Sequence, residues 1–152
     1  MILKIYTDGA CSGNGKEDGG SGGWAAVLLF GASRKEISGH VGNTTNNRME
    51  LQSVIEGLKA ITKPVKVEVY SDSTYVVNAV NNGWIENWKK NGWRNAAKAE
   101  VKNQDLWHEL VALNDVYNPK YIKVKGHSDD VNNNRADELA VAASLKAKTL
   151  EE

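Results

Sequence analysis

Two segments of the chain repeat one pattern, and this repeat constrains the fold more than any other feature of the sequence. Residues 3–8 and 67–72 are rich in strand-forming residues, and each ends in tyrosine, a hydroxyl residue and aspartate. Because side chains in a strand alternate between two faces, the apolar residues share one face, while tyrosine and aspartate share the other. Parallel neighbouring strands of this kind would place Asp8 and Asp72 side by side, at the sheet edge where open α/β sheets bind ligands.

The aspartates that end the two segments suggest a cation site. Two carboxylates that lie close together raise each other's pKa unless a cation lies between them. Two further acidic residues, Glu50 and Asp137, stand near the starts of expected helices. Oxygen ligands without nearby cysteine favour Mg²⁺ or Mn²⁺ over zinc. Each aspartate of the repeat could instead cap a following turn or helix, and acidic residues are common near helix N-termini.

The remaining pattern predicts an α/β fold in a single domain, residues 1–152. A glycine-rich run, residues 9–23, is expected to form a loop. The other expected elements are strands at 24–30, 35–41 and 121–124 and helices at 48–61, 73–80, 105–113 and 135–148. Three strands followed by alternating helices and strands predict a mixed sheet with helices on its faces.

The composition fits one globular domain and does not identify a partner. The chain has 152 residues, of which 41% are hydrophobic, enough to bury a core. Nineteen basic and nineteen acidic residues cancel, so only local charge can indicate what the protein binds. Cys11 is the only cysteine, which excludes an internal disulfide and suits a reducing compartment. The sequence has neither signal-peptide features nor an apolar run of membrane-spanning length, so we expect a cytoplasmic protein without a membrane span.

His127 is a candidate proton carrier. It lies in a loop rich in glycine and asparagine, residues 126–134, shortly before Asp137. An imidazole titrates near neutral pH, so it could move a proton to or from a reacting oxygen. A loop histidine that makes only local hydrogen bonds explains the sequence equally well.

A basic, tryptophan-rich segment, residues 84–102, is a candidate nucleic-acid-binding surface. Its five basic residues outnumber two acidic ones, and it holds three of the five tryptophans. Basic side chains among aromatic ones suit a phosphate backbone with stacking on sugars or bases. The tryptophans could instead pack on the core, which the spacing of Trp84 and Trp88 also fits. Lys89, Lys90 and Trp88 are the preferred contacts.

Seven motifs, in order along nearly the whole chain, resemble those of bacterial ribonuclease HI. They are YTDGACSGN, TTNNRMEL, SDSTYV, WIENWKKNGW, KNQDLW, VKGH and NNRADELA. The block at residues 44–51 is very specific. The resemblance implies a ribonuclease H-like α/β fold, with a five-stranded mixed sheet flanked by helices. In that sheet, strands 1 to 3 are antiparallel, and strands 4 and 5 run parallel to strand 1.

The resemblance also implies an activity. It is endonucleolytic hydrolysis of the RNA strand of RNA–DNA hybrids by a two-metal-ion mechanism, leaving 5′-phosphate and 3′-hydroxyl ends. Mg²⁺ is the implied cofactor, Mn²⁺ could replace it, and a monomer is expected. The positions that match the family's four metal-binding acids and its catalytic histidine are Asp8, Glu50, Asp72, Asp137 and His127.

Other positions match the family's substrate contacts. The residues that would meet the minor groove of the hybrid, where 2′-hydroxyls mark the RNA strand, are Asn14, Asn46 and Asn47. Those that match a pocket for a DNA phosphate are Thr45 and Asn87, and the match to a supporting residue beside the site is Asn133. The segment 84–102 matches a basic protrusion, with Trp84, Trp88, Lys89 and Lys90 as its contacts.

Three departures from the family pattern concern substrate binding and leave the acids intact. The loop at 14–23 is longer and lacks proline, Thr74 stands where glutamine is usual, and Asn43 replaces a basic residue. We therefore expect catalysis to survive with weaker binding. A non-catalytic hybrid-binding module is the main alternative, and the four intact acids argue against it. An integrase-like nuclease would normally have further domains.

Overall fold

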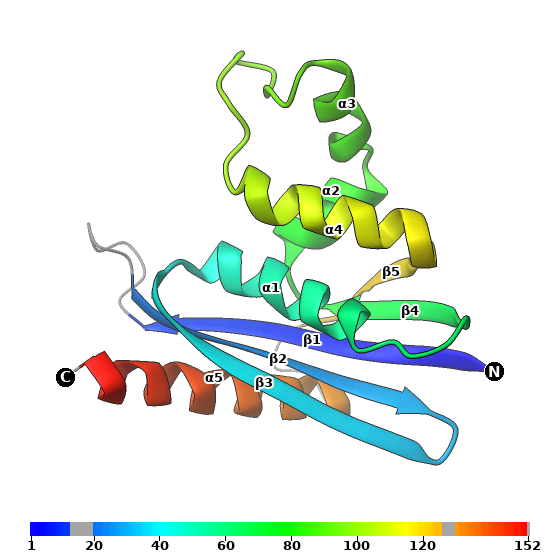
Figure 1. Cartoon of the computed structure of the whole chain (residues 1–152), viewed down its shortest axis with the longest axis vertical. Coiled ribbons are helices and arrows are strands. Elements are labelled where there is room, and N and C mark those ends of the chain that lie inside the picture. The colour runs from blue at the N-terminus through cyan, green and yellow to red at the C-terminus, as the bar shows by residue number, and fades with distance from the viewer. Residues whose placement is uncertain (13–19, 126–129, 152) are drawn as a thin grey trace.

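The structure, a computed structural model, describes residues 1–12, 20–125 and 130–151, with side chains as far as Ala147 (Figure 1). In chain order its elements are β1 (Ile2–Ser12), β2 (Gly20–Phe30), β3 (Ser33–Thr44), α1 (Asn46–Lys59), β4 (Lys66–Ser71), α2 (Thr74–Asn81), α3 (Trp84–Lys90), α4 (Gln104–Tyr117), β5 (Lys120–Lys123) and α5 (Val131–Glu151). None of the helices in the described ranges combines the length and the apolar character that crossing a membrane requires.

The strands form one mixed sheet in the order β3-β2-β1-β4-β5. β2 pairs antiparallel with both β1 and β3, whereas β4 lies parallel to β1, and β5 parallel to β4. This topology confirms the predicted fold class. In the register of β1 and β4, Tyr6 lies opposite Tyr70 and Thr7 opposite Ser71, so the two repeated segments are side by side and in phase.

Helices cover both faces of the sheet, but unequally (Figure 1). α1 packs on β1 and β2 and is itself covered by α4, whereas α5 lies on the opposite face against β1, β2 and β3. The larger core, between the sheet and α1, α2 and α4, includes Ile5, Val69, Leu51, Val54, Ile55, Leu58, Trp107 and Leu110. The smaller core, under α5, contains Tyr6, Val27 and Ala136.

α1 forms because its apolar residues recur at helical spacing and because Thr45 caps it. Thr45 has an extended backbone, and its Oγ1 accepts a hydrogen bond from the N–H of Arg48 at 3.3 Å. The helix therefore begins at Asn46, two residues before the predicted start. Glu50 lies in its second turn and is buried against the sheet.

The sequence predicts a loop for the whole glycine-rich run, residues 9–23, and the structure contradicts this at both ends. β1 continues to Ser12 and β2 begins at Gly20. A Cβ at Gly9 would lie 2.4 Å from the backbone nitrogen of Glu50, and one at Gly23 would lie 2.2 Å from the carbonyl oxygen of Ala140. These glycines let α1 and α5 approach the strands closely, so they serve packing rather than a turn.

Three further helices differ from the sequence prediction, and of these α4 ends at Tyr117 rather than at residue 113. Residues 84–90 form α3, for which the sequence predicts no helix; Gly83, with a φ of 77°, turns the chain into it. α5 begins at Val131 rather than at residue 135, because Asp130 caps it. The earlier start extends the helix by one turn toward β3.

Candidate active site

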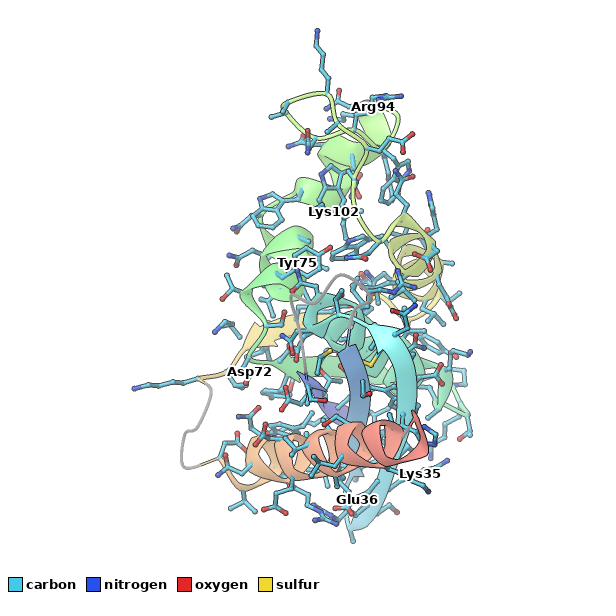
Figure 2. The ribbon with its side chains drawn as sticks, turned by 90° about the vertical axis from the view of Figure 1, so that its left-hand side faces the viewer. Lys35, Glu36, Asp72, Tyr75, Arg94 and Lys102 are labelled. Atoms are coloured by element: carbon cyan, nitrogen blue, oxygen red, sulfur yellow. The ribbon has the colours of Figure 1, made fainter. Side chains whose placement is uncertain are left out.

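Three carboxylates meet where β1 and β4 end side by side. Asp8 comes from β1, Asp72 follows the last residue of β4, and Glu50 comes from α1. One ligand oxygen from each lies within 4.8 Å of the other two. Asp8 and Glu50 are only 4% and 5% exposed, whereas Asp72 is half-buried, between α5 and the helices of the other face (Figure 2). The phase of the repeated segments thus brings Asp8 and Asp72 together, as their sequence predicts.

Burial and mutual repulsion destabilise the ionised forms of this cluster. Burial is the largest cause that raises the pKa of Asp8, followed by the charges of Glu50 and Asp72. Burial also raises the pKa of Glu50, and the charge of Asp72 adds to this. Without a cation, the cluster therefore holds protons at pH values where ordinary carboxyl groups have lost them. A divalent cation would remove the repulsion and restore the ionised forms.

The two oxygens of Glu50 differ in a way that fits a metal ligand. Its Oε1 accepts a hydrogen bond from the N–H of Gly9 at 2.7 Å, and the same N–H also donates to Oδ1 of Asp8 at 3.0 Å. Its Oε2 is buried and has no hydrogen-bond partner among the described residues. Leaving a buried carboxylate oxygen unpaired is costly, and a hard cation would compensate for it. The donor set therefore fits Mg²⁺ or Mn²⁺.

α5 brings a fourth acid to the cluster from the opposite face of the sheet. Asp137, half-buried in the second turn of α5, lies outside the group of three but interacts with the side chain of Asp8 and so contributes to the raised pKa of that carboxyl. Its charge also raises the pKa of Glu50. Its approach to Asp8 and Glu50 adds negative charge to the cluster, which a cation would offset. The catalytic candidate His127 and the substrate-binding candidate Asn14 lie outside the described residues.

Three predicted substrate contacts form the N-terminus of α1, about one turn before Glu50. Thr45 and Asn47 are exposed, and Asn46 is half-buried. The N–H groups and the positive dipole end of a helix N-terminus favour an anion. Arg48, which follows, donates two hydrogen bonds of 2.9 and 2.7 Å to a carboxylate of α4. That ion pair joins α1 to α4 and fixes the direction of the helix N-terminus.

The basic protrusion, residues 84–102, lies beyond α4, on the side of the molecule away from α5 (Figure 1). Asn87, Lys89 and Lys90 are exposed on α3. Figure 2 shows Arg94 at the tip of the protrusion. The protrusion therefore presents its charged side chains to solvent, at a distance from the buried carboxylates.

The two tryptophans of α3 differ in their surroundings. The ring centroid of Trp88 lies 5.3 Å from that of Trp107 and 5.9 Å from that of Trp93. Trp84 is 38% exposed, whereas Trp88 is half-buried. Both line a cavity of about 220 Å³ together with Asn87. Trp88 therefore anchors the protrusion to the core, the alternative that the sequence leaves open, and Trp84 exposes more of its ring.

A tyrosine pair behind the carboxylates is not identified as part of the site from the sequence. Tyr6 and Tyr70 stand two positions before Asp8 and Asp72, and their rings stack with centroids 4.5 Å apart and planes 12° apart. Burial is the largest cause that raises the pKa of both phenols. Their place in the repeated segments is a signal that could have located them.

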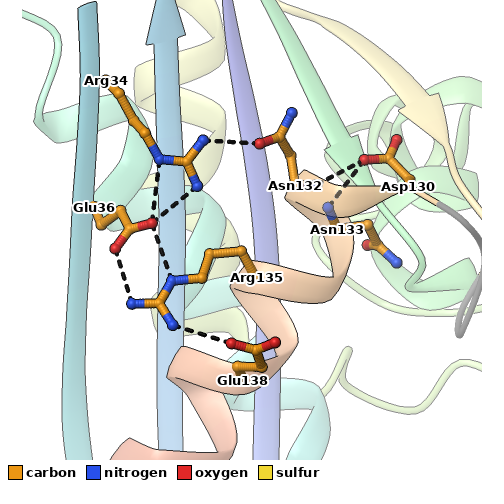
Figure 3. A network of polar contacts seen from close by, with 7 residues as sticks. All are labelled: Arg34, Glu36, Asp130, Asn132, Asn133, Arg135 and Glu138. Carbon is orange, nitrogen blue, oxygen red and sulfur yellow. Dashed lines mark hydrogen bonds and ion pairs between the residues drawn. The ribbon is translucent and has the colours of Figure 1, made fainter.

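A polar network at the start of α5 is the second feature that sequence analysis misses (Figure 3). Glu36 of β3 accepts hydrogen bonds from Arg34 and Arg135, and Arg34 also donates to Asn132. Asn133, in the same turn, is only 3% exposed, and its Oδ1 has no partner within the described ranges. The strand and helix residues lie 98 and 99 positions apart, so no local pattern reveals their contact.

Comparison with known proteins finds close relatives over nearly the whole chain. The family model for RNase H matches residues 2–145. Ribonuclease H of Thermoanaerobacter sp. (strain X514) is 57% identical over 139 residues, which are 91% of this chain and 87% of the relative. Ribonuclease H of Chlorobaculum parvum is 55% identical over 138 residues, which are 91% of this chain and 92% of the relative.

Solved structures share the fold. LC9-RNase H1, a type 1 RNase H with the type 2 active-site motif, has a TM-score of 0.85 at 30% identity, over 96% of this chain and 73% of that one. LC11-RNase H1 in complex with an RNA/DNA hybrid has a TM-score of 0.70 at 24% identity, over 96% of this chain and 99% of that one. The second likeness, at lower identity, shows the fold alone.

Proposed function

This chain belongs to the ribonuclease H family and hydrolyses the RNA strand of RNA–DNA hybrids, and from that premise we propose a catalytic metal centre of four acids. They are Asp8, Glu50, Asp72 and Asp137. The observation that carries the proposal is that three carboxylates meet within 4.8 Å. In addition, one buried oxygen of Glu50 has no hydrogen-bond partner in the described part of the chain. Such a cluster is unfavourable unless a cation binds to it.

Mg²⁺ suits this centre, with Mn²⁺ as a substitute, because both prefer carboxylate oxygens. The four acids would hold these ions, and a bound pair would supply activation of the attacking water and stabilisation of the leaving 3′-oxygen, consistent with 5′-phosphate and 3′-hydroxyl ends. The chain's own part is to hold the acids in place. The N–H of Gly9 fixes oxygens of Asp8 and Glu50, and strand pairing fixes Asp72 beside Asp8. Asp137 completes the centre from α5.

His127 is the proposed proton carrier of the reaction. It precedes Asp137 by ten positions in the sequence. An imidazole exchanges protons near pH 6.5, so it can protonate the leaving oxygen and help the product to depart. The family match at this position supports the role.

The hybrid is proposed to lie across the N-terminus of α1. Its minor groove, where 2′-hydroxyls identify the RNA strand, would contact Asn14, Asn46 and Asn47. A phosphate of the DNA strand would be held by Thr45 and Asn87, and the exposed N-terminus of α1 supports an anion there. The supporting residue beside the acids would be Asn133.

The basic protrusion is proposed to supply the remaining contacts. Lys89 and Lys90 are exposed and suit phosphate oxygens. Trp84 presents more ring surface for stacking, and Trp88 adds the part of its ring that its packing leaves exposed. These contacts address the backbone, so they add affinity without sequence preference.

A cleavage assay with four substrates tests the proposed centre. RNA–DNA hybrid, double-stranded RNA, double-stranded DNA and single-stranded RNA are incubated with and without Mg²⁺. We expect cutting of the hybrid's RNA strand, only with the metal, and cutting about a hundredfold or more slower by the Asp8→Asn and Asp137→Asn variants. Binding of the hybrid without cutting by the parent protein would identify a non-catalytic binding module instead. Full activity of Asp137→Asn would remove that acid from the centre.

A further inference from the structure

The first turn of α5 has its own anchoring, separate from the packing of the rest of the helix. Asp130 caps the turn, because its Oδ1 accepts hydrogen bonds from the N–H groups of Asn132 and Asn133 at 3.0 and 3.1 Å. Asp137 follows one turn later. Whatever holds this turn in place therefore also sets where Asp137 lies.

The packing of α5 on the sheet does not by itself fix the helix along its axis. Most residues that α5 buries are small, among them Ala136, Ala140 and Ala143, and the last two lie over Gly23 of β2. Small side chains let the helix come close to the sheet. They provide few ridges that would oppose a shift along the axis.

A contact with β3 supplies that restraint (Figure 3). Nη1 of Arg34 donates to Oδ1 of Asn132 at 2.9 Å. Arg34 is itself oriented by Glu36, whose Oε2 accepts from its Nη2 at 2.9 Å. Glu36 also accepts two hydrogen bonds from Arg135, of 3.0 and 3.1 Å. One carboxylate of β3 thus orients two guanidinium groups that hold the start of α5.

A contact with β1 acts on the same side chain. The side chain of Asn132 also lies beside the hydroxyl of Tyr6, where it acts to lower the pKa of that phenol, and Tyr6 is held by its stacking on Tyr70. Tyr6 stands two positions before Asp8 on the same strand face. The amide of Asn132 therefore links α5 to the strand that carries Asp8, and to the edge strand β3.

We propose that Asn132, oriented by Arg34 and Glu36 of β3, is a positioning residue that fixes the distance between Asp137 and Asp8. The inference rests on the proposed role of Asp137 in the metal centre. The network is partly exposed, with side-chain exposures of 43% for Arg34 and 27% for Glu36. Exposed ion pairs contribute little to stability, so its main effect is on geometry. A metal centre depends on such geometry, because its ligands must be held closely in place.

Substitution of Asn132 tests the proposal. Asn132→Ala should weaken Mn²⁺ binding about tenfold, the usual effect of losing a group that orients a ligand. Two measurements apply: calorimetric titration of the metal-free protein with Mn²⁺, and hydrogen exchange of the amides at 131–137, which should become faster. The melting temperature and the KM for the hybrid at saturating metal should stay near the parent values. Arg34→Ala, on the strand side of the contact, should have the same effect. It replaces Asn132→Ala as the test if that variant folds poorly.

Glu109→Gln is the matched control. It removes an exposed ion pair between α1 and α4, in which Lys59 Nζ lies 3.5 Å from Glu109 Oε1, far from α5 in the fold. It should change neither Mn²⁺ binding nor exchange in α5. Glu36→Gln combined with Asn132→Ala should give less than the sum of the single effects, because both act through Arg34.

The outcome for Asp137→Asn separates this inference from the function it rests on. If Asp137→Asn leaves Mn²⁺ binding unchanged, the proposed centre of four acids is wrong, and the positioning role is lost with it. If Asp137→Asn weakens binding while Asn132→Ala and Arg34→Ala match the Glu109→Gln control, only the positioning role is overturned.

Discussion

The carboxylate cluster and the basic protrusion are built in opposite ways. The cluster joins side chains from β1, α1, α5 and the residue after β4, and most of its carboxylate surface is buried. The protrusion is one continuous segment, and its charged side chains are exposed. Chemistry at a phosphate requires groups at fixed positions, whereas attraction to a phosphate backbone tolerates movement. Substitutions should therefore stop the reaction in the first region and weaken binding gradually in the second.

The largest expected effect is that of Asp8→Asn. It should lower kcat by about a hundredfold to a thousandfold, as the loss of one group that stabilises charge in the transition state does. The variant should also melt at the parent temperature or higher in chelator, since it removes a source of repulsion within the cluster. Single-turnover cleavage and thermal unfolding measure the two effects. If Asp8→Asn cuts at the parent rate, the carboxylate cluster does not differ from the basic protrusion in the way proposed.

Trp88→Ala comes next and tests whether the protrusion is anchored as described. Its ring packs on Trp107 and Trp93, so its loss should lower the free energy of unfolding by about 2 kcal/mol. Trp84→Ala should leave stability within about 0.5 kcal/mol of the parent, because the ring is more exposed. Urea denaturation compares them. Equal losses in the two variants would contradict the assignment of Trp88 as the anchor.

The pH dependence of stability should distinguish the cluster from an ordinary surface. The pKa values of Asp8 and Glu50 are raised in the folded state, so the folded protein binds more protons than the unfolded chain at pH values above their ordinary range. The free energy of unfolding should therefore fall as the pH rises from about 4 toward these raised values.

Urea denaturation in chelator measures this slope. Between pH 5 and 8, the fall in the free energy of unfolding should be about 1 to 2 kcal/mol smaller for Asp8→Asn than for the parent. Mg²⁺ should abolish most of this fall in the parent protein. Identical slopes for parent and variant would show that the cluster does not titrate in the way its burial indicates.

The smallest effect is expected for the pair Lys89→Ala and Lys90→Ala. Loss of two phosphate contacts should raise KM by about threefold to tenfold and leave kcat unchanged. The slope of log affinity against log salt should become shallower by about 2. Lys146→Ala, on the exposed side of α5, is the control and should change neither value. An unchanged salt slope in the double variant would place these lysines off the substrate.

The parts of the fold that follow from local pattern could be predicted from the sequence. The repeated segments gave the phase in which Asp8 and Asp72 meet, because strand periodicity and parallel pairing leave one register in which both segments match. The helix predicted at 48–61 likewise puts Glu50 near a helix start, where the structure has it. Both predictions depend on patterns within short segments of the chain.

The parts that depend on distant neighbours could not be predicted. Gly9 and Gly23 look like loop residues until the helices that pack against them are known. The contact of Arg34 with Asn132 joins residues that no shared period connects. Trp84 and Trp88 are the same residue type one helical turn apart, and only the packing of Trp88 on Trp107 and Trp93 distinguishes them.

The two unequal cores have a consequence for how the enzyme would fail on heating. Three acids are carried by the larger core, and Asp137 is carried by a helix that rests on the smaller one. Detachment of that single helix would leave most of the molecule folded but without its fourth carboxylate. Cutting should then cease several degrees before the bulk of the protein melts, so that catalysis reports thermal damage earlier than any spectroscopic probe of the main body.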